Sequence, residues 1–330
     1  MEQYAMIMGE TFLSWNALIL TAAAAVSICF FLAFYLGKTG NAIAGFAAVP
    51  VCLVLSLILA RFVHWYCRAD SYESFWAAMT DYTSGGFALL GAFAGCLLGA
   101  GIVRVLFLNR NLPQMLDCMA IAGCAGMAVG RLASFFNSSD RGQIVEKIQS
   151  LPFVYPVTNA VSGQLEYRLA TFVIQAMVAG ALFVGLAIFE WRSRGRKQDG
   201  DTCLIFLLFY GASQVVLDST RYDSLFFRSN GFVSMVQVLA AVAMAFAAVL
   251  FSVRLVKRTG LRWWYVLLWL LQAAGVGAAG YMEYYVQRRG NEAVFAYSVM
   301  SACLLAVVAL ALVIRSLGRR SRKSAADFIG

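Results

Sequence analysis

Two arginines and an aspartate lie where an apolar segment of the chain ends. Residues 130–142 contain Arg131, Asp140 and Arg141 and follow an apolar run that begins near Ala120. If that run crosses a bilayer, these ionisable groups lie near membrane depth, where they usually face a bundle interior or a wet cavity. Arg131 is therefore the first candidate for anion binding or catalysis. The alternative is an arginine whose stem lies in lipid while its head reaches the phosphates.

A second group of polar side chains recurs with helical spacing. Tyr210, Gln214, Asp218 and Arg221 are spaced i, i+4, i+8 and i+11, which predicts one face of a helix. A polar stripe along a membrane helix must face protein or water and not lipid. A functional role is favoured here, and a purely structural ion pair between Asp218 and Arg221 is the alternative.

The amino-acid composition is that of a membrane protein. Of the 330 residues, 61% are hydrophobic and 13% are charged, whereas soluble domains are about 45–50% apolar and about 25% charged. A transmembrane helix needs about 20 apolar residues. We therefore expect an all-α polytopic integral membrane protein. Its nine predicted transmembrane helices cover residues 12–36, 42–62, 85–108, 115–136, 167–190, 202–220, 231–253, 263–283 and 293–315.

The basic residues predict how the chain is oriented. The strongest clusters of Lys and Arg, at residues 192–197, 254–262 and 315–323, all fall on the same side of the predicted membrane. Cytoplasmic loops carry such an excess of positive charge. We expect the N-terminus outside and the C-terminus in the cytoplasm. Basic residues in the cytoplasmic loops account for the net charge of +9, which therefore does not indicate a nucleic-acid partner.

A glycine-rich segment lies at the outer end of the third predicted helix. Its first residues, Ser84, Gly85 and Gly86, can expose backbone N–H groups that suit a phosphate. The spacing that follows is typical of close helix packing and involves Gly91, Gly95 and Gly99. Because Arg131 and Arg221 approach the same leaflet and arginine binds phosphate in bidentate fashion, the residues predict a phosphate-attracting cavity. A phospholipid is the expected ligand.

Three segments of the chain match, in order, the pattern of one known family. Residues 130–142 read Gly-Arg-Leu-Ala-Ser-Phe-Phe-Asn-Ser-Ser-Asp-Arg-Gly and resemble G-R-x-G-N-F-x-N-x-E-x-x-G. Residues 209–221 resemble G-Y-G-x-x-R-x-x-x-E-x-x-R, and residues 84–91 resemble x-G-G-x-x-x-H-G-G. These are motifs of the prolipoprotein diacylglyceryl transferases. With Asp117 and Arg61 also fitting, the resemblance predicts a transferase-like membrane domain over residues 1–256. Residues 257–330 then form an added two-helix extension with a basic cytoplasmic tail.

The resemblance implies an activity, a location and partners. Members of the family are seven-helix enzymes of the bacterial cytoplasmic (inner) membrane. They move the diacylglyceryl group of phosphatidylglycerol onto the lipobox cysteine thiol of a prolipoprotein and release glycerol phosphate. The implied partners are the membrane, phosphatidylglycerol and a prolipoprotein signal peptide, and no cofactor is expected. The candidate catalytic residues are Arg131, Tyr210, Asp218 and Arg221. The candidate phospholipid-binding residues are Arg131, Ser84, Gly85, Gly86, Ser134, Asn137, Ser139 and Gln214.

The chain departs from the family pattern where the chemistry is concentrated. Leu90 stands in place of the family's essential histidine, Ser139 in place of its glutamate and Gln214 in place of its arginine. A thiol must lose its proton before it attacks carbon, and leucine cannot accept a proton. The candidate substitutes are His64, at the outer end of the second helix, and Asp218. Because His64 is the single histidine of the chain, a multi-histidine metal site is excluded.

Three functions stay open at this point. The first is a diverged diacylglyceryl transferase, or a related transferase that uses a phospholipid donor. The second is a catalytically inactive relative that binds phospholipid or a lipoprotein. The third is a small-solute transporter whose path is lined by the polar stripe at residues 210–221, and the lack of a visible inverted repeat speaks against it.

Overall fold

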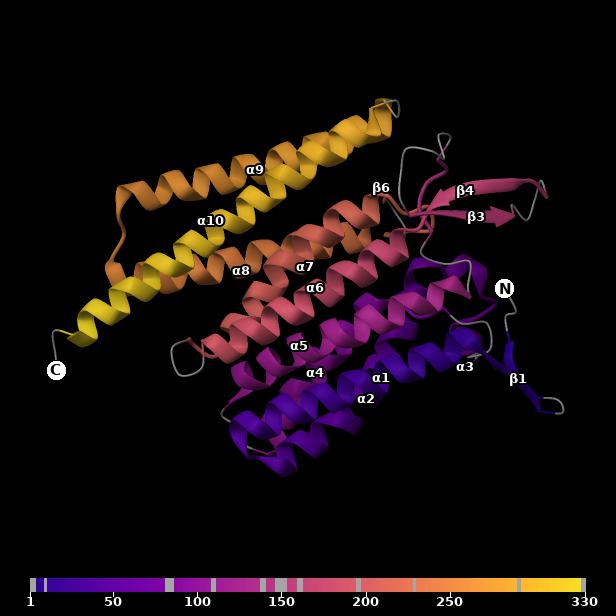
Figure 1. Cartoon of the computed structure of the whole chain (residues 1–330), viewed down its shortest axis with the longest axis horizontal. Coiled ribbons are helices and arrows are strands. Elements are labelled where there is room, and N and C mark those ends of the chain that lie inside the picture. Colours follow the sequence, from indigo (N-terminus) through magenta and orange to yellow (C-terminus); the bar gives the residue numbers. More distant parts are fainter. Residues whose placement is uncertain are drawn as a thin grey trace. The chain divides into compact units, whose positions relative to one another are not determined.

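The computed structural model describes residues 4–8, 11–80, 86–107, 111–136, 141–145, 153–158, 163–193, 197–227, 230–289 and 292–327. These residues form helices α1 (Trp15–Thr39), α2 (Ala42–Cys67), α3 (Phe75–Thr80), α4 (Leu89–Leu106), α5 (Leu112–Gly130), α6 (Thr171–Arg192), α7 (Asp201–Ser219), α8 (Met235–Thr259), α9 (Trp263–Arg289) and α10 (Ala293–Asp327) (Figure 1). Two short 3₁₀ helices accompany them, η1 (Ala69–Ser71) and η2 (Arg131–Phe135).

Within the described ranges, three antiparallel strand pairs accompany the helices, one before α1 and two between helices. They are β1 (Tyr4–Met8) with β2 (Thr11–Ser14), β3 (Val154–Thr158) with β4 (Leu165–Leu169), and β5 (Phe226–Phe227) with β6 (Asn230–Ser234). The register of the second pair runs from Val154 opposite Leu169 to Thr158 opposite Leu165. The sequence analysis did not predict these strands, because each is too short to show a clear alternation of polar and apolar residues.

The predicted polytopic architecture is confirmed. In the part of the chain that the structure describes, nine helices are long and apolar enough to cross a membrane. They are α1, α2 and α4 to α10, and α3 has only six residues. The last helix was predicted to end near residue 315, whereas α10 continues to Asp327. The added residues include Arg, Lys and Ala, which are good helix formers outside a membrane.

The contacts divide the chain into two compact units. Unit 1 consists of Met1–Phe206 and Thr220–Val236, and unit 2 consists of Leu207–Ser219 and Gln237–Gly330. One boundary thus falls inside α7, and the contacts group α8 with α9 and α10. The functional boundary that the sequence predicts near residue 256 stays a prediction.

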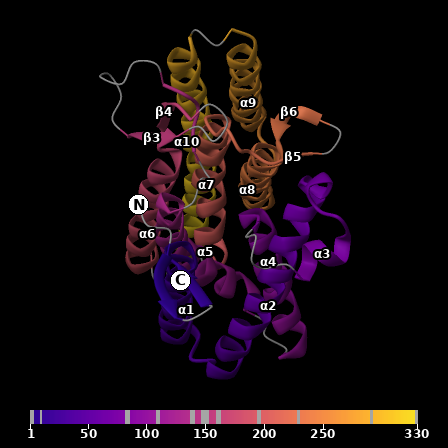
Figure 2. The ribbon, with the colours of Figure 1, turned by 90° about the vertical axis from the view of Figure 1, so that its right-hand side faces the viewer.

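Unit 1 is built on two helix pairs. α2 packs along α4, and α1 packs along α5, which also contacts α6 (Figure 1 and Figure 2). The α2–α4 contact follows the spaced glycines of α4. A Cβ atom added at Gly91 would collide with the backbone of Leu59, and one at Gly95 would collide with the backbone of Ser56. The predicted role of these glycines in close helix packing is confirmed.

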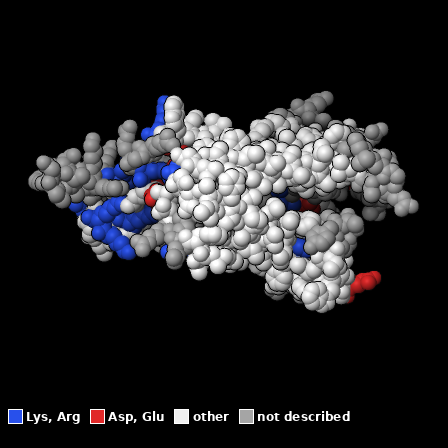
Figure 3. Space-filling model, turned by 90° about the horizontal axis from the view of Figure 1, so that it is seen from below, with Lys and Arg blue, Asp and Glu red and all other residues white. Residues whose placement is uncertain are grey.

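Unit 2 contains the second part of α7 together with α8, α9 and α10. Its α9 and α10 pack along each other, and Trp269 of α9 donates to Ser252 of α8 at 3.0 Å. In the view of the whole chain from below, Figure 3 shows Lys and Arg gathered toward the left-hand end of the face that it draws. The middle of that face carries little charge, as a membrane-crossing surface requires.

Replacement of Gly95 by leucine is expected to destabilise the α2–α4 pair, because the new side chain must displace the backbone of α2. Overpacking of this kind costs about 1–3 kcal/mol and more where backbone must move. Thermal unfolding of the purified protein in detergent would show a lowered midpoint. Gly101→Leu is the matched control, since nothing lies within 4 Å of a Cβ atom there. An equal loss in both variants would contradict this account of the packing.

Candidate functional site

Arg61 fixes the end of α2 against the start of α4. Its side chain is 1% exposed. The guanidinium donates from Nε to the carbonyl oxygen of Ala78 and from Nη1 to that of Gly86 at 3.0 Å. The rings of Tyr72 and Phe87 lie 5.2 and 5.6 Å from the guanidinium carbon. Because a buried cation is stable only when its donors are satisfied, Arg61 ties the carbonyl groups on either side of residues 81–85 to α2.

Gly86 forms a tight turn against this arginine. Its φ is +81°, which favours glycine. A Cβ atom on it would lie 2.7 Å from Cε1 of His64 and 2.9 Å from Nη1 of Arg61. Glycine is thus required here both by the backbone and by the close approach of two side chains. Two other predicted phospholipid-binding residues of this segment, Ser84 and Gly85, lie outside the described residues.

His64 is held beside that turn by a phenol. Its Nδ1 lies 3.1 Å from Oη of Tyr72, and the two rings meet edge to face at 6.0 Å. Within the described ranges, no hydrogen bond is formed by its other nitrogen, Nε2. When Nδ1–H donates to the phenol oxygen, Nε2 is left as a proton acceptor. The structure therefore provides an oriented imidazole next to Gly86.

Arg131 stands where α5 ends and η2 begins. Its backbone N–H donates to the carbonyl groups of the preceding turn, and its side chain is half-buried. Aromatic contacts hold η2 in place, with Phe135 and Phe172 at 4.7 Å and Trp15 and Phe136 at 5.7 Å between ring centroids. These contacts connect η2 to α6 and α1. Ser134 is buried within η2, whereas Asn137 and Ser139 lie outside the described residues.

Three further guanidinium groups gather at short strand bridges, and the sequence analysis proposed a role for only one of them, Arg221. Gly142 bridges to Arg221, and Ile144 bridges to Arg168. Arg141 precedes the first bridge, and its carbonyl oxygen accepts the N–H of Tyr222 at 2.9 Å. The group is thus assembled from three distant parts of the chain, and no spacing in the sequence signals it. We call Arg141, Arg168 and Arg221 the arginine cluster.

Two carboxylates lie inside the arginine cluster. Arg168 pairs with Glu166 at 2.8 Å, and Arg221 pairs with Asp223 at 3.1 Å. Burial lowers the pKa of Arg141, and the neighbouring charge of Arg168 acts in the same direction. The described part of the cluster thus brings three guanidinium groups together, and arginine is the side chain best suited to bind a phosphate or another anion.

Aromatic rings cover two of these guanidinium groups. Arg141 lies over Tyr155 at 5.4 Å, and Arg168 lies over Tyr222 at 4.5 Å. Tyr155 belongs to β3, where it pairs directly with Arg168 of β4. The β3–β4 pair therefore presents both a cation and an aromatic ring, and arginine stacked in this way keeps its planar fork oriented.

The end of α2 connects to the segment that carries the arginine cluster. Arg68 donates from Nη2 to the carbonyl oxygen of Asp223 at 3.5 Å, and the Cys67 Sγ and Met235 Sδ atoms lie 3.5 Å apart. Both contacts are inside unit 1. The imidazole and the cluster thus belong to the same end of its helices, which is also the end that carries Arg131.

The polar stripe of the sixth predicted helix is correct in part. Gln214 and Asp218 are 2% and 1% exposed, and Tyr210 is half-buried, so these side chains face protein as predicted. All three belong to unit 2. Arg221 does not share their helix, which corrects the prediction. The helix ends at Ser219 because the backbone of Thr220 and Tyr222 turns to bond residues 141–143.

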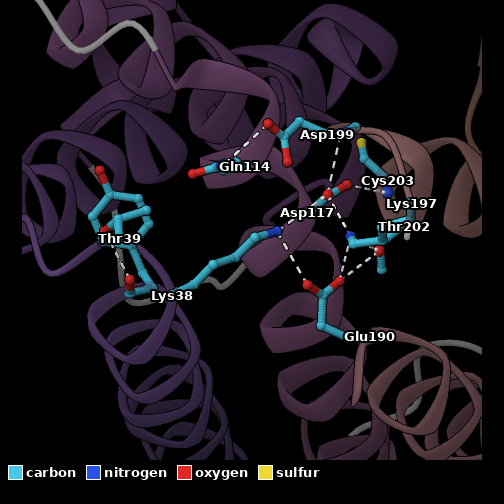
Figure 4. A network of polar contacts seen from close by, with 11 residues as sticks. Lys38, Thr39, Gln114, Asp117, Glu190, Lys197, Asp199, Thr202 and Cys203 are labelled. Atoms are coloured by element: carbon cyan, nitrogen blue, oxygen red, sulfur yellow. Dashed lines mark hydrogen bonds and ion pairs between the residues drawn. The ribbon is translucent and has the colours of Figure 1, made fainter. Parts of the chain in front are cut away.

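A buried ion network lies at the opposite end of α5 (Figure 4). Asp117 is fully buried and pairs with Lys197 at 2.7 Å and with Lys38 at 3.5 Å. Lys38 also pairs with Glu190 at 3.0 Å, and Thr202 donates to the same carboxylate at 2.7 Å. Two positive and two negative side chains are thus brought together from α1, α5, α6 and the residues before α7.

Backbone groups complete this network. The N–H groups of Gly200 and Cys203 donate to Asp117 at 3.1 and 2.9 Å. The network pairs two lysines with two carboxylates, and it lies at the other end of α5 from Arg131. We therefore assign it a structural role in fastening one end of unit 1.

Asp117→Ala is expected to destabilise unit 1, because it leaves buried lysine charges and two N–H groups without their acceptor. Removal of one partner from a buried charge network lowers the free energy of unfolding by about 3–5 kcal/mol. Gln114→Ala is the control, since Gln114 donates to Asp199 at 2.9 Å in an exposed contact worth about 1 kcal/mol. Thermal midpoints in detergent separate the two variants. A midpoint for Asp117→Ala as high as that of the control would contradict the assignment.

The fold and the site together define a multi-pass membrane protein with an arginine-rich site at one end of its first helices. Comparison with known sequences then gives the family. The model of the prolipoprotein diacylglyceryl transferase family matches residues 3–253, and the chain belongs to this family. The resemblance seen in the motifs is thereby confirmed.

Individual relatives agree with this assignment. The chain is 26% identical over 204 residues to the phosphatidylglycerol–prolipoprotein diacylglyceryl transferase of Streptococcus equi subsp. zooepidemicus (strain H70), across 60% of this chain and 76% of that one. It is 29% identical over 186 residues to the enzyme of the same name from Streptococcus pneumoniae (strain JJA), across 55% and 68% of the two chains. The family match ends at residue 253, so α9 and α10 lie beyond it.

Proposed function

We propose that this protein transfers the diacylglyceryl group of phosphatidylglycerol to the lipobox cysteine thiol of a prolipoprotein. The observation that carries the proposal is the family match over residues 3–253. Relatives named for phosphatidylglycerol and prolipoprotein support the choice of donor and acceptor. The match also favours a transferase over a small-solute transporter.

In the proposed reaction, the thiolate attacks the carbon of the diacylglyceryl group that is bonded to the phosphate oxygen. A carbon–sulfur bond forms, the carbon–oxygen bond to the phosphate breaks, and glycerol phosphate leaves with the electron pair. Fixed cations stabilise the charge that develops on such a leaving group. We assign this role to Arg131 and Arg221, and the grouping of Arg221 with Arg141 and Arg168 at the strand bridges supports it. Tyr210 and Asp218 are the further proposed catalytic residues.

The phospholipid headgroup is proposed to contact small polar groups around these arginines. The buried hydroxyl of Ser134 and the turn at Gly86, beside Arg61 and His64, support two of these contacts. The remaining proposed contacts are carried by the resemblance alone and involve Ser84, Gly85, Asn137, Ser139 and Gln214.

His64 is proposed as the group that accepts the thiol proton. An imidazole oriented through one nitrogen by a hydrogen-bond partner, with the other nitrogen available, is the usual arrangement of a general base. The contact of Nδ1 with Tyr72 and the position against Gly86 both support this role. Asp218 is the alternative base.

For the orientation we propose that the N-terminus is outside and the C-terminus is in the cytoplasm of a bacterial inner membrane. The basic clusters at residues 254–262 and 315–323 support this direction. The end of unit 1 that carries Arg131 then faces the outer leaflet, where a prolipoprotein signal peptide would present its cysteine.

A second candidate is a relative that binds phospholipid or a lipoprotein without turnover. Leu90, in the first turn of α4, favours this candidate because it offers no proton acceptor at the position where the family has its histidine. Phosphatidylglycerol retained at unit stoichiometry in the purified protein, with no product, would distinguish it from the transferase.

Complementation tests the proposed function. The protein is expressed in a bacterium depleted of its own diacylglyceryl transferase, and lipoprotein maturation is followed by gel shift. We expect rescue by the natural sequence and none by Arg131→Ala. The control is Arg104→Ala, which removes an exposed arginine in the last turn of α4 and should rescue fully. Lack of rescue by the natural sequence, with the protein in the membrane, would contradict the proposal.

His64→Ala is expected to lower kcat for a lipobox peptide about 10²–10⁴-fold, the usual contribution of a general base. Added imidazole should restore part of the rate, because a small base can occupy the space left by the side chain. Tyr72→Phe, which removes only the orienting hydroxyl, should lose less. An unchanged rate in His64→Ala would exclude the imidazole and leave Asp218.

A further inference from the structure

A buried carboxylate connects α9 to the end of α7. Glu283 of α9 is 7% exposed. Its Oε2 accepts the hydroxyl of Ser219 at 2.6 Å, and its Oε1 accepts Nε2 of Gln287 at 3.0 Å. Ser219 is the last residue of α7 and follows Asp218 directly. All four residues belong to unit 2.

α10 contacts the same residue from a second direction. Tyr297 donates from Oη to the carbonyl oxygen of Ser219 at 3.3 Å, and the Ser219 hydroxyl lies 3.4 Å from that phenol. The last carbonyl groups of a helix have no partner inside the helix, so the phenol satisfies one that α7 leaves open. Both helices beyond the family match thus bond to one residue beside Asp218.

Simple packing of two extra helices would not require this arrangement. Glu283 lies at the end of the predicted span 263–283, and a buried ionisable residue near membrane depth often has a function. Elsewhere on α9, Gln272 is also buried, but it donates to the carbonyl oxygen of Val307 on α10 at 3.5 Å. That contact joins the two added helices to each other, whereas the Glu283 contact joins them to α7.

We infer that α9 and α10 position Asp218, a proposed catalytic residue of unit 2, by holding the end of α7. In this inference Glu283 is a positioning residue that acts through Ser219 on the last turn of α7 and thereby orients Asp218. Tyr297 supports the same turn through its carbonyl group. The inference rests on the proposed function, and it makes the added helices part of the enzyme rather than an appendage.

The test uses the full chain in nanodiscs that contain phosphatidylglycerol, with a lipobox peptide as acceptor. We expect Glu283→Ala and Ser219→Ala each to lower kcat roughly 10- to 100-fold, the loss typical of a catalytic group displaced by about 1 Å. The KM for the peptide should change less than about twofold, because the contact is not with the peptide. Glu283→Gln keeps an acceptor oxygen for Ser219 and should recover most of the rate.

Two comparisons separate positioning from a general loss of folding. Gln272→Ala, the matched buried control on α9, should keep the natural kcat. The double variant Glu283→Ala with Ser219→Ala should be no slower than either single variant, since both remove the same interaction. A natural kcat in Glu283→Ala, an equal loss in Gln272→Ala or fully additive losses would each overturn the inference.

Hydrogen exchange gives a readout that does not depend on turnover. Backbone amides near the end of α7 should exchange faster in Glu283→Ala than in the natural protein, and should be unchanged in Gln272→Ala. Unchanged exchange in Glu283→Ala would overturn the inference even if the protein is active. Absence of turnover in the natural protein, with faster exchange in Glu283→Ala, would instead contradict the proposed function and leave the contact as a structural connection.

Discussion

A charged side chain at membrane depth needs counter-ions or hydrogen-bond partners from the protein. This constraint shapes both ends of unit 1. At one end of α5, Asp117 collects two lysines and two backbone N–H groups. These contacts join α1, α5 and the residues before α7. At the other end, Arg61 donates to carbonyl groups and lies among aromatic rings, and the arginine cluster pairs with Glu166 and Asp223. One end is thus neutralised internally, and the other gathers arginines, the side chains best suited to bind phosphate.

Local constraints fix the side chains at the end of unit 1 that carries Arg131. Close packing of α2 on α4 is possible because α4 carries glycine where the helices approach. That packing brings the end of α2, with Arg61 and His64, against the turn at Gly86. Because the Arg61 guanidinium donates to carbonyl groups before and after residues 81–85, the backbone at Gly86 has little freedom. The imidazole of His64, which lies against Gly86, is held in the same way. An oriented group of this kind is what proton transfer to a defined base requires.

The sequence predicts the helices well and the site only in part. Spans of about 20 apolar residues are a strong local signal, and all nine appear among the described residues. Arg131 is singled out because it follows such a span directly, and its role stays a prediction. Arg141 and Arg168 were missed, because they join Arg221 only through bridges between distant segments. Arg221 itself was placed on the wrong element, since helical spacing cannot show where backbone pairing ends a helix. Glu283 gave no signal because its partner, Ser219, lies on another helix.

The central claim is that this protein catalyses transfer from phosphatidylglycerol, and mass spectrometry tests it most directly. The purified chain is placed in nanodiscs with isotopically labelled phosphatidylglycerol and a lipobox peptide. The account predicts a labelled diacylglyceryl thioether on the peptide cysteine and an equal amount of released glycerol phosphate. Phosphatidylglycerol bound to the protein, with neither product formed, would contradict it and identify a lipid-binding relative without turnover.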